Sequence, residues 1–135
     1  MTREAPEPST AGRTRAAPIT ISVVNEGPDA ARTLAVSGEI DLAGIDTLRE
    51  AINTAVERDG VRRLTVDLGA VTFLDSSGIG TLVFGRNLAI RRGAALWVVN
   101  ATGMVRTVLE LTGVLPILSH PDGDTLLDSG RPGPD

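Results

Sequence analysis

Cysteine and lysine are both absent from this chain of 135 residues. Without cysteine there is no disulfide and no thiolate metal site. Without lysine there is no amine for a Schiff base and no lysine for a phosphate-binding loop. With a single histidine, His120, we expect neither a zinc site nor a Ser-His-Asp triad. The composition therefore predicts a protein with no catalytic residue, no metal and no cofactor.

Aromatic side chains are scarce as well, because Phe73, Phe84 and Trp97 are the whole set. The formal net charge is −4, so the chain has neither the stacking platforms nor the basic character of a nucleic-acid-binding protein. No apolar run is long enough to cross a membrane, and residues 1–17 lack the apolar centre of a signal peptide. We expect a cytoplasmic protein with no nucleic-acid partner and no membrane partner.

Both ends of the chain are rich in residues that disfavour a packed core. Residues 1–17 carry Pro, Arg, Ser and Thr without apolar periodicity, and residues from 120 on carry Pro and Gly at close intervals. A short last helix is allowed around residues 122–127. We expect disordered tails at 1–17 and 129–135, which leaves one folded domain at 18–128.

Strands and helices alternate within that domain. A β-branched run at 19–24 and a second run at 33–36 flank the turn residues 26–29, which predicts a hairpin. Apolar residues at helical spacing predict helices from 44 to about 58, over 77–91 and over 102–111. The remaining strands are expected at 64–68, 95–99 and 115–118, with residues 71–74 leading from the first of these into the next turn. Trp97 is expected to fill the core. This order predicts an α/β fold whose mainly parallel central sheet has about five strands, an N-terminal hairpin and crossover helices.

The most informative segment is VTFLDSSGIGTL, residues 71–82. An apolar stretch leads into Asp75, Ser76 and Ser77, each of which can accept a hydrogen bond from a free N–H in the first turn of a helix. Gly78 and Gly80 are poor helix formers and leave bare backbone that another molecule can approach. One interpretation is a simple N-cap. The other is a modification site, because a phosphoserine adds roughly −1.5 to −2 charges and a helix N-terminus tolerates them.

The helix predicted at 77–91 is more apolar than one buried stripe requires. Six large apolar side chains cannot all face inward on a period of 3.6 residues; they are Ile79, Leu82, Val83, Phe84, Leu88 and Ile90. We interpret the surplus next to Ser76 as part of a surface that binds a partner.

Four motifs in order now identify a family resemblance. They are Gly38-Glu39-Ile40-Asp41, then Val66-Asp67-Leu68, then residues 73–80 with the sequence FLDSSGIG, and finally Gly113-Val114. With this set, the chain resembles the STAS domain, and specifically the stand-alone bacterial anti-sigma-factor antagonists. The resemblance spans about residues 19–118 and implies the STAS fold.

The resemblance also implies a mechanism. Relatives of this kind, when unphosphorylated, bind an anti-sigma factor that is itself a serine kinase with a histidine-kinase-like ATPase fold, and this binding frees the sigma factor. The kinase phosphorylates the serine after the motif aspartate, here Ser76, and a protein serine phosphatase reverses the step. Ser77 is then a helix cap, while Asp41 and Asp75 shape the turn. The partner-binding residues expected are Asp41, Asp75, Ser77, Gly78, Ile79, Gly80 and Leu82.

Two other functions stay open at this point. A STAS scaffold or ligand-binding module of a transporter or signalling complex would keep the fold without using a phosphorylated serine. An enzyme is the third alternative, and the missing catalytic side chains argue against it. We expect the protein to be a monomer.

Overall fold

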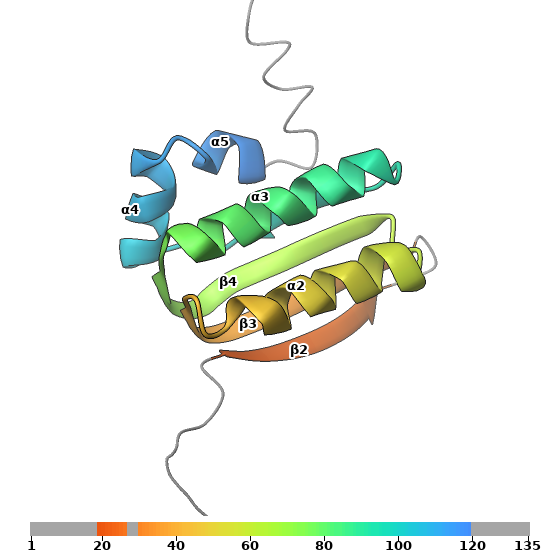
Figure 1. Ribbon diagram of the computed structural model, residues 1–135, viewed down its shortest axis with the longest axis horizontal. Helices are drawn as coiled ribbons and strands as arrows, with labels where there is room; N and C mark the ends of the chain where they lie inside the picture. Colours follow the sequence, from red (N-terminus) through yellow and green to blue (C-terminus); the bar gives the residue numbers. More distant parts are fainter. Residues whose placement is uncertain (1–18, 27–29, 120–135) are drawn as a thin grey trace, which may run out of the picture.

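The computed structural model describes residues 19–26 and 30–119, except for the side chain of Glu26. The predicted tails and the last helix at 122–127 lie outside this range. Two antiparallel strands come first, and helices then alternate with parallel strands (Figure 1). In chain order the elements are β2 (Ile19–Glu26), β3 (Ala31–Ile40), α2 (Ile45–Asn53), the π-helical turn η1 (Thr54–Arg58), β4 (Arg63–Leu74), α3 (Ser76–Arg91), β5 (Ala95–Val99), α4 (Gly103–Leu111) and α5 (Leu115–Leu118).

The strands form one mixed sheet in the order β2-β3-β4-β5. β2 and β3 pair antiparallel, which confirms the predicted hairpin, and β3, β4 and β5 are parallel. The sheet has four strands in the described residues, where about five were expected. The segment predicted as a strand at 115–118 is instead the short helix α5, whose first turn contains Pro116. Proline has no N–H to donate, which the first turn of a helix does not need.

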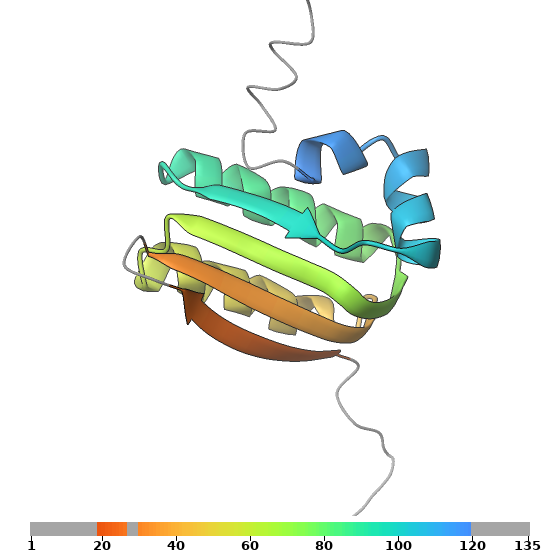
Figure 2. The same ribbon diagram turned by 180° about the vertical axis from the view of Figure 1, so that it is seen from behind.

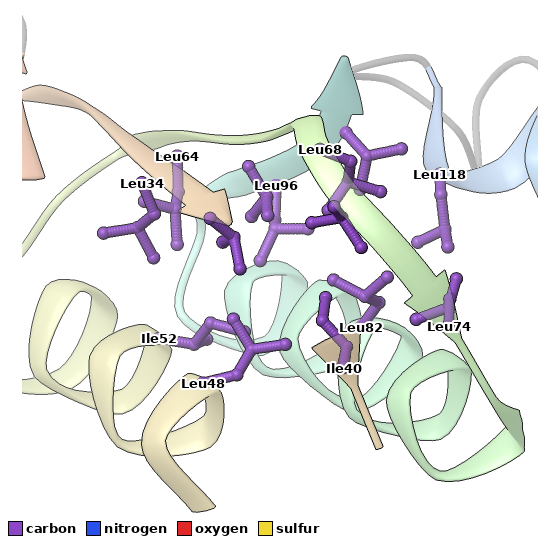
Figure 3. Close-up of a cluster of buried hydrophobic side chains, with 14 of the residues drawn as sticks. Leu34, Ile40, Leu48, Ile52, Leu64, Leu68, Leu74, Leu82, Leu96 and Leu118 are labelled. Carbon is purple, nitrogen blue, oxygen red and sulfur yellow. The ribbon is translucent and has the colours of Figure 1, made fainter. Parts of the chain in front are cut away.

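The core lies between the sheet and helices α2 and α3, which cover the same face (Figures 1 and 2). Strand residues on this side alternate with residues on the other, as the pleat requires. The buried side chains from the sheet and the helices meet in a leucine-rich layer (Figure 3). Its labelled members are Leu34, Ile40, Leu48, Ile52, Leu64, Leu68, Leu74, Leu82, Leu96 and Leu118.

The opposite face of the sheet carries Trp97, which corrects the prediction that this residue fills the core. Leu96 and Val98 face the helices and are buried. Because successive side chains of a strand point to opposite faces, Trp97 lies on the other side of the sheet, where it is half-buried. Its neighbours across the sheet are Thr65, Thr33 and Val24 in register. In Figure 2 the strands lie in front of α2 and α3, so this face is turned away from both helices.

β4 continues without a break to Leu74, whereas the predicted strand ended at Leu68. Its ladder with β3 shifts twice, because Ser37 pairs with Ala70 instead of Gly69, and Glu39 pairs with Phe73 instead of Thr72. Each shift is a β-bulge that inserts one extra residue into β4. The buried positions follow the bulges, since their spacing changes from two to three along Leu64, Val66, Leu68, Val71 and Leu74.

α3 is apolar on several sides because it packs against several elements. It contacts α2, α5, β4 and β5. On the α2 side, the guanidinium carbon of Arg49 lies 5.0 Å from the centroid of the Phe84 ring, within the range of a cation–π contact. Most of the surplus apolar residues of α3 therefore pack against neighbouring elements. Among the described residues, no helix has the length and hydropathy needed to cross a membrane.

Candidate functional site

The segment 75–78 lies where the parallel strands β3 and β4 end. The last residues of the two strands, Ile40 and Leu74, are register partners. The N–H of Asp75 donates a hydrogen bond to the carbonyl of Ile40 at 3.2 Å, so the start of α3 is fixed to the end of β3. In open α/β sheets the carboxyl ends of the strands form the edge at which ligands bind.

Asp75 is the N-cap of α3. Its backbone is extended, and its Oδ1 accepts hydrogen bonds from the N–H groups of Ser77 at 3.0 Å and Gly78 at 3.1 Å. The hydroxyl of Ser77 donates to the same oxygen at 2.6 Å. The Ser77 hydroxyl bond is the largest cause that lowers the pKa of Asp75 below its ordinary value, and the two backbone N–H groups add to it. Asp75 is therefore a charged structural cap, committed to the turn.

The two serines of this turn are in different environments. Ser77 is half-buried, and its hydroxyl is bound to Asp75. Ser76 is exposed at the first position of α3, and its hydroxyl makes no hydrogen bond to any described residue. Of the pair, only Ser76 presents a free hydroxyl to solvent.

Asp41 organises the loop that follows β3. Its Oδ1 accepts a hydrogen bond from the N–H of Ala43 at 3.1 Å, and its carbonyl accepts one from the N–H of Gly44 at 2.9 Å. A side chain that binds the backbone two residues on forms an Asx turn. The turn displays Leu42, whose exposed fraction is 74%. Sequence reasoning missed Leu42, although an apolar residue in a tight turn directly after Gly38-Glu39-Ile40-Asp41 is a usable signal.

Gly78 is buried, which corrects its expected role in partner binding. A Cβ at this position would lie 2.5 Å from Cδ1 of Leu74 and 2.6 Å from Cγ2 of Ile40. The glycine thus allows α3 to pack closely against the ends of two strands. Gly80 is exposed and has open space around it, so its bare backbone is accessible from outside.

Leu82 requires the same correction. Its exposed fraction is 0%, and it points into the leucine-rich layer (Figure 3), so it cannot form part of the accessible surface. Ile79 is half-buried and packs against the core. The structure therefore brings together, at one edge, the accessible residues Asp41, Leu42, Asp75, Ser76, Ser77, Ile79 and Gly80. We call this set the Ser76 surface.

No cluster of three or more metal-ligating side chains occurs within residues 19–26 and 30–119. The carboxylates of Asp41 and Asp75 each bind backbone N–H groups of their own turn. The chemistry that the Ser76 surface offers is thus one exposed hydroxyl at a helix N-terminus and one exposed leucine on the connected loop.

Comparison with known proteins gives one family. The STAS domain model matches residues 22–126. The crystal structure of an anti-sigma factor antagonist from Mycobacterium paratuberculosis is 32% identical, with a TM-score of 0.64, covering 84% of this chain and 94% of that one. An anti-sigma-B factor antagonist of Staphylococcus aureus is 26% identical over 88 residues, which are 65% of this chain and 81% of the relative. An anti-sigma F factor antagonist of Paenibacillus polymyxa is 26% identical over 89 residues, or 66% and 76% of the two chains. The chain belongs to the STAS domain family.

Proposed function

We propose that this STAS protein is an anti-sigma factor antagonist that is switched off by phosphorylation of Ser76. Its unphosphorylated form binds an anti-sigma factor through the Ser76 surface and thereby releases the sigma factor. The names of the relatives from three bacteria support the regulatory role. One observation carries the assignment to Ser76: it is exposed with a free hydroxyl, while Ser77 is held by Asp75.

The covalent step belongs to the partner. We take the anti-sigma factor to be a serine kinase with a histidine-kinase-like ATPase fold, which brings ATP and magnesium. The Ser76 oxygen attacks the γ-phosphorus of ATP, an O–P bond forms, ADP leaves, and the hydroxyl proton passes to a base of the kinase. A protein serine phosphatase returns the serine by hydrolysis to inorganic phosphate. The antagonist is the substrate in both reactions and contributes no catalytic residue.

A phosphate on Ser76 is compatible with the fold. The hydroxyl points to solvent at the first position of α3, where the helix dipole favours negative charge by about 0.3–1 kcal/mol. Asp75 already binds the N–H groups of Ser77 and Gly78. The phosphate therefore changes the surface without disturbing the cap. It adds roughly −1.5 to −2 charges next to Asp75, on a surface that also carries Asp41, and it blocks docking by charge and bulk.

The test uses the purified protein and the purified kinase-type anti-sigma factors of the same organism. Wild type and Ser76→Ala should bind one of these kinases, and Ser76→Asp should bind at least tenfold more weakly, which corresponds to about 1.4 kcal/mol. Titration calorimetry measures the affinity. With ATP and magnesium, the kinase should phosphorylate wild type and Ser77→Ala but not Ser76→Ala, as read by mass spectrometry.

Two results would contradict the proposal. Phosphate on Ser76→Ala would place the acceptor elsewhere. Binding of none of the kinases would favour the alternative, a STAS scaffold or ligand-binding module in which Ser76 only begins a helix. We also propose that the protein acts in the cytoplasm as a monomer.

A further inference from the structure

Leu42 is the most exposed large apolar side chain of the Ser76 surface. Its exposed fraction of 74% is exceeded only by the 83% of Leu111 among the large apolar residues described. Exposed leucines occur singly on many protein surfaces, so exposure alone assigns no role. Leu42 is set apart by its position in a constrained turn that a hydrogen bond between Asp75 and Ile40 connects to the loop of Ser76.

The turn holds Leu42 in place. The carboxylate of Asp41 binds the N–H of Ala43, and the carbonyl of Asp41 binds the N–H of Gly44. Turn positions ordinarily carry Gly, Asn, Asp, Ser or Pro. Here an apolar side chain stands at the tip of a turn with a fixed backbone. An anchor that is ordered before binding loses less conformational entropy when it docks.

Leu42 and Ser76 fall within the area of one interface. The hydrogen bond of 3.2 Å between Asp75 and Ile40 connects the two loops. Chain geometry then limits the Cα–Cα distance from Leu42 to Ser76 to at most about 19 Å. A standard protein interface covers about 800 Å² on each partner, a disc roughly 30 Å across. One interface of this size can therefore include both Ser76 and Leu42.

We propose that Leu42 is the apolar anchor of the complex, inserted into an apolar pocket of the anti-sigma factor. This inference rests on the proposed function and adds the residue that supplies affinity at that surface. All charged residues from position 39 to position 46 are acidic; they are Glu39, Asp41 and Asp46. The pocket that fits this surface is therefore apolar at its centre and free of carboxylates at its rim, because like charges across an interface weaken binding.

The same anchor explains how a phosphate on Ser76 acts. A phosphate is strongly hydrated, and moving it next to an apolar contact requires either the loss of that water or a gap between the surfaces. In both cases Leu42 cannot fully enter its pocket. The switch and the anchor are separate residues on adjacent loops, so they can be tested separately.

The experiment measures the affinity of Leu42→Ser for the kinase that wild type binds. Loss of a buried anchor should weaken binding about 10- to 100-fold. Leu42→Met, which keeps an apolar side chain, should bind within about threefold of wild type. Leu111→Ser is the matched control, because it removes a comparably exposed leucine, the last residue of α4. It should leave the affinity unchanged. The midpoint of thermal unfolding checks that all three variants fold.

Phosphorylation kinetics provide a second readout. Leu42→Ser should raise the KM for phosphorylation of Ser76 and leave kcat within about twofold, because the anchor binds but does not react. Equal affinity of Leu42→Ser and wild type would overturn the anchor and leave the proposed function standing. Equal losses in Leu42→Ser and Leu111→Ser would also overturn it. A wild type that binds no kinase would refute the proposed function itself, together with the anchor.

Discussion

At the scale of single residues, Asp75 is the most constrained side chain of the site. One of its oxygens accepts three hydrogen bonds, two from backbone N–H groups and one from the hydroxyl of Ser77. N-caps of this kind stabilise a protein by about 1 kcal/mol. Asp75 and Ser76 are neighbours in different environments, since the first caps the helix and the second has an exposed hydroxyl.

Asp75→Ala should lower the free energy of unfolding by about 1 kcal/mol at pH 7. The folded protein lowers the pKa of Asp75 below its ordinary value of 3.8. Its stabilisation is therefore complete above pH 3.8 and disappears as the pH falls through the lowered pKa. Urea titrations of both proteins at several pH values measure the difference. Asp46→Ala, in the first turn of α2, is the control and should lose less at pH 7.

A difference between wild type and Asp75→Ala that stayed constant down to pH 2 would show that the carboxylate charge is not the source of the stability. A helix start at this point was predictable from sequence, because Asp-Ser-Ser before an apolar helix is a strong N-terminal signal. The capping residue was not: the family resemblance implied Ser77, whereas the N-cap is Asp75. The resemblance did assign different roles to the two serines, but the residues alone could not, because the difference depends on which hydroxyl donates to the Asp75 oxygen.

At the scale of elements, the contact between the start of α3 and the ends of β3 and β4 decides the geometry of the site. Gly78 sits in this contact, where a Cβ has no room beside Ile40 and Leu74. Sequence reasoning attributed Gly78 and Gly80 to the same cause, an approaching partner. The two glycines lie in different environments, one buried and one exposed. The sequence could not show this, because only tertiary packing distinguishes a buried helix position from an exposed one.

Gly78→Ala should destabilise the protein by about 1–3 kcal/mol, the usual range for overpacking. Gly80→Ala is the matched control two residues along the same helix. It meets no atom within 4 Å and should stabilise the protein by about 0.5–1 kcal/mol, since alanine favours the helix. Chemical denaturation of both variants gives the two free energies. Equal stability of the variants would show that α3 shifts to accept the methyl group.

The remaining elements show where sequence patterns succeed and fail. The helices and the N-terminal hairpin were predictable from apolar periodicity and turn residues. The strand predicted at 115–118 became α5, because a short apolar run fits either structure and Pro116 favours a first helical turn. The strand β4 was predicted to end at Leu68, because the bulges interrupt its alternation near Gly69 and Thr72.

At the scale of the whole molecule, the two faces of the sheet differ. One face packs on α2 and α3, and the other presents Trp97 next to Thr65 and Thr33. The family could be predicted from motifs spread over the chain. The face on which Trp97 lies could not be predicted, because the strand sequence Leu-Trp-Val is apolar on both sides and does not indicate which residues face the helices.

Trp97 is the single tryptophan of the chain and reports on the face that carries it. With fluorotryptophan incorporated, the protein should give one fluorine NMR resonance. That resonance should stay in place when the anti-sigma factor binds, because the Ser76 surface lies at the edge of the sheet and Trp97 lies on its face. The Leu111→Ser variant without the partner serves as a control and should show no shift of this resonance. A large shift of the fluorine resonance in the complex would then show that the partner covers the sheet face.

The two bulges of β4 have a mechanical consequence. Over the same stretch, β4 has two more residues than β3, and the excess contour length must appear as curvature of the strand. Ser76 follows directly at the end of this curved strand, with one capping residue between them. It is therefore attached to the sheet without a flexible linker. A kinase that phosphorylates Ser76, as proposed above, would meet a stiff substrate and would have to bring its own active site into alignment.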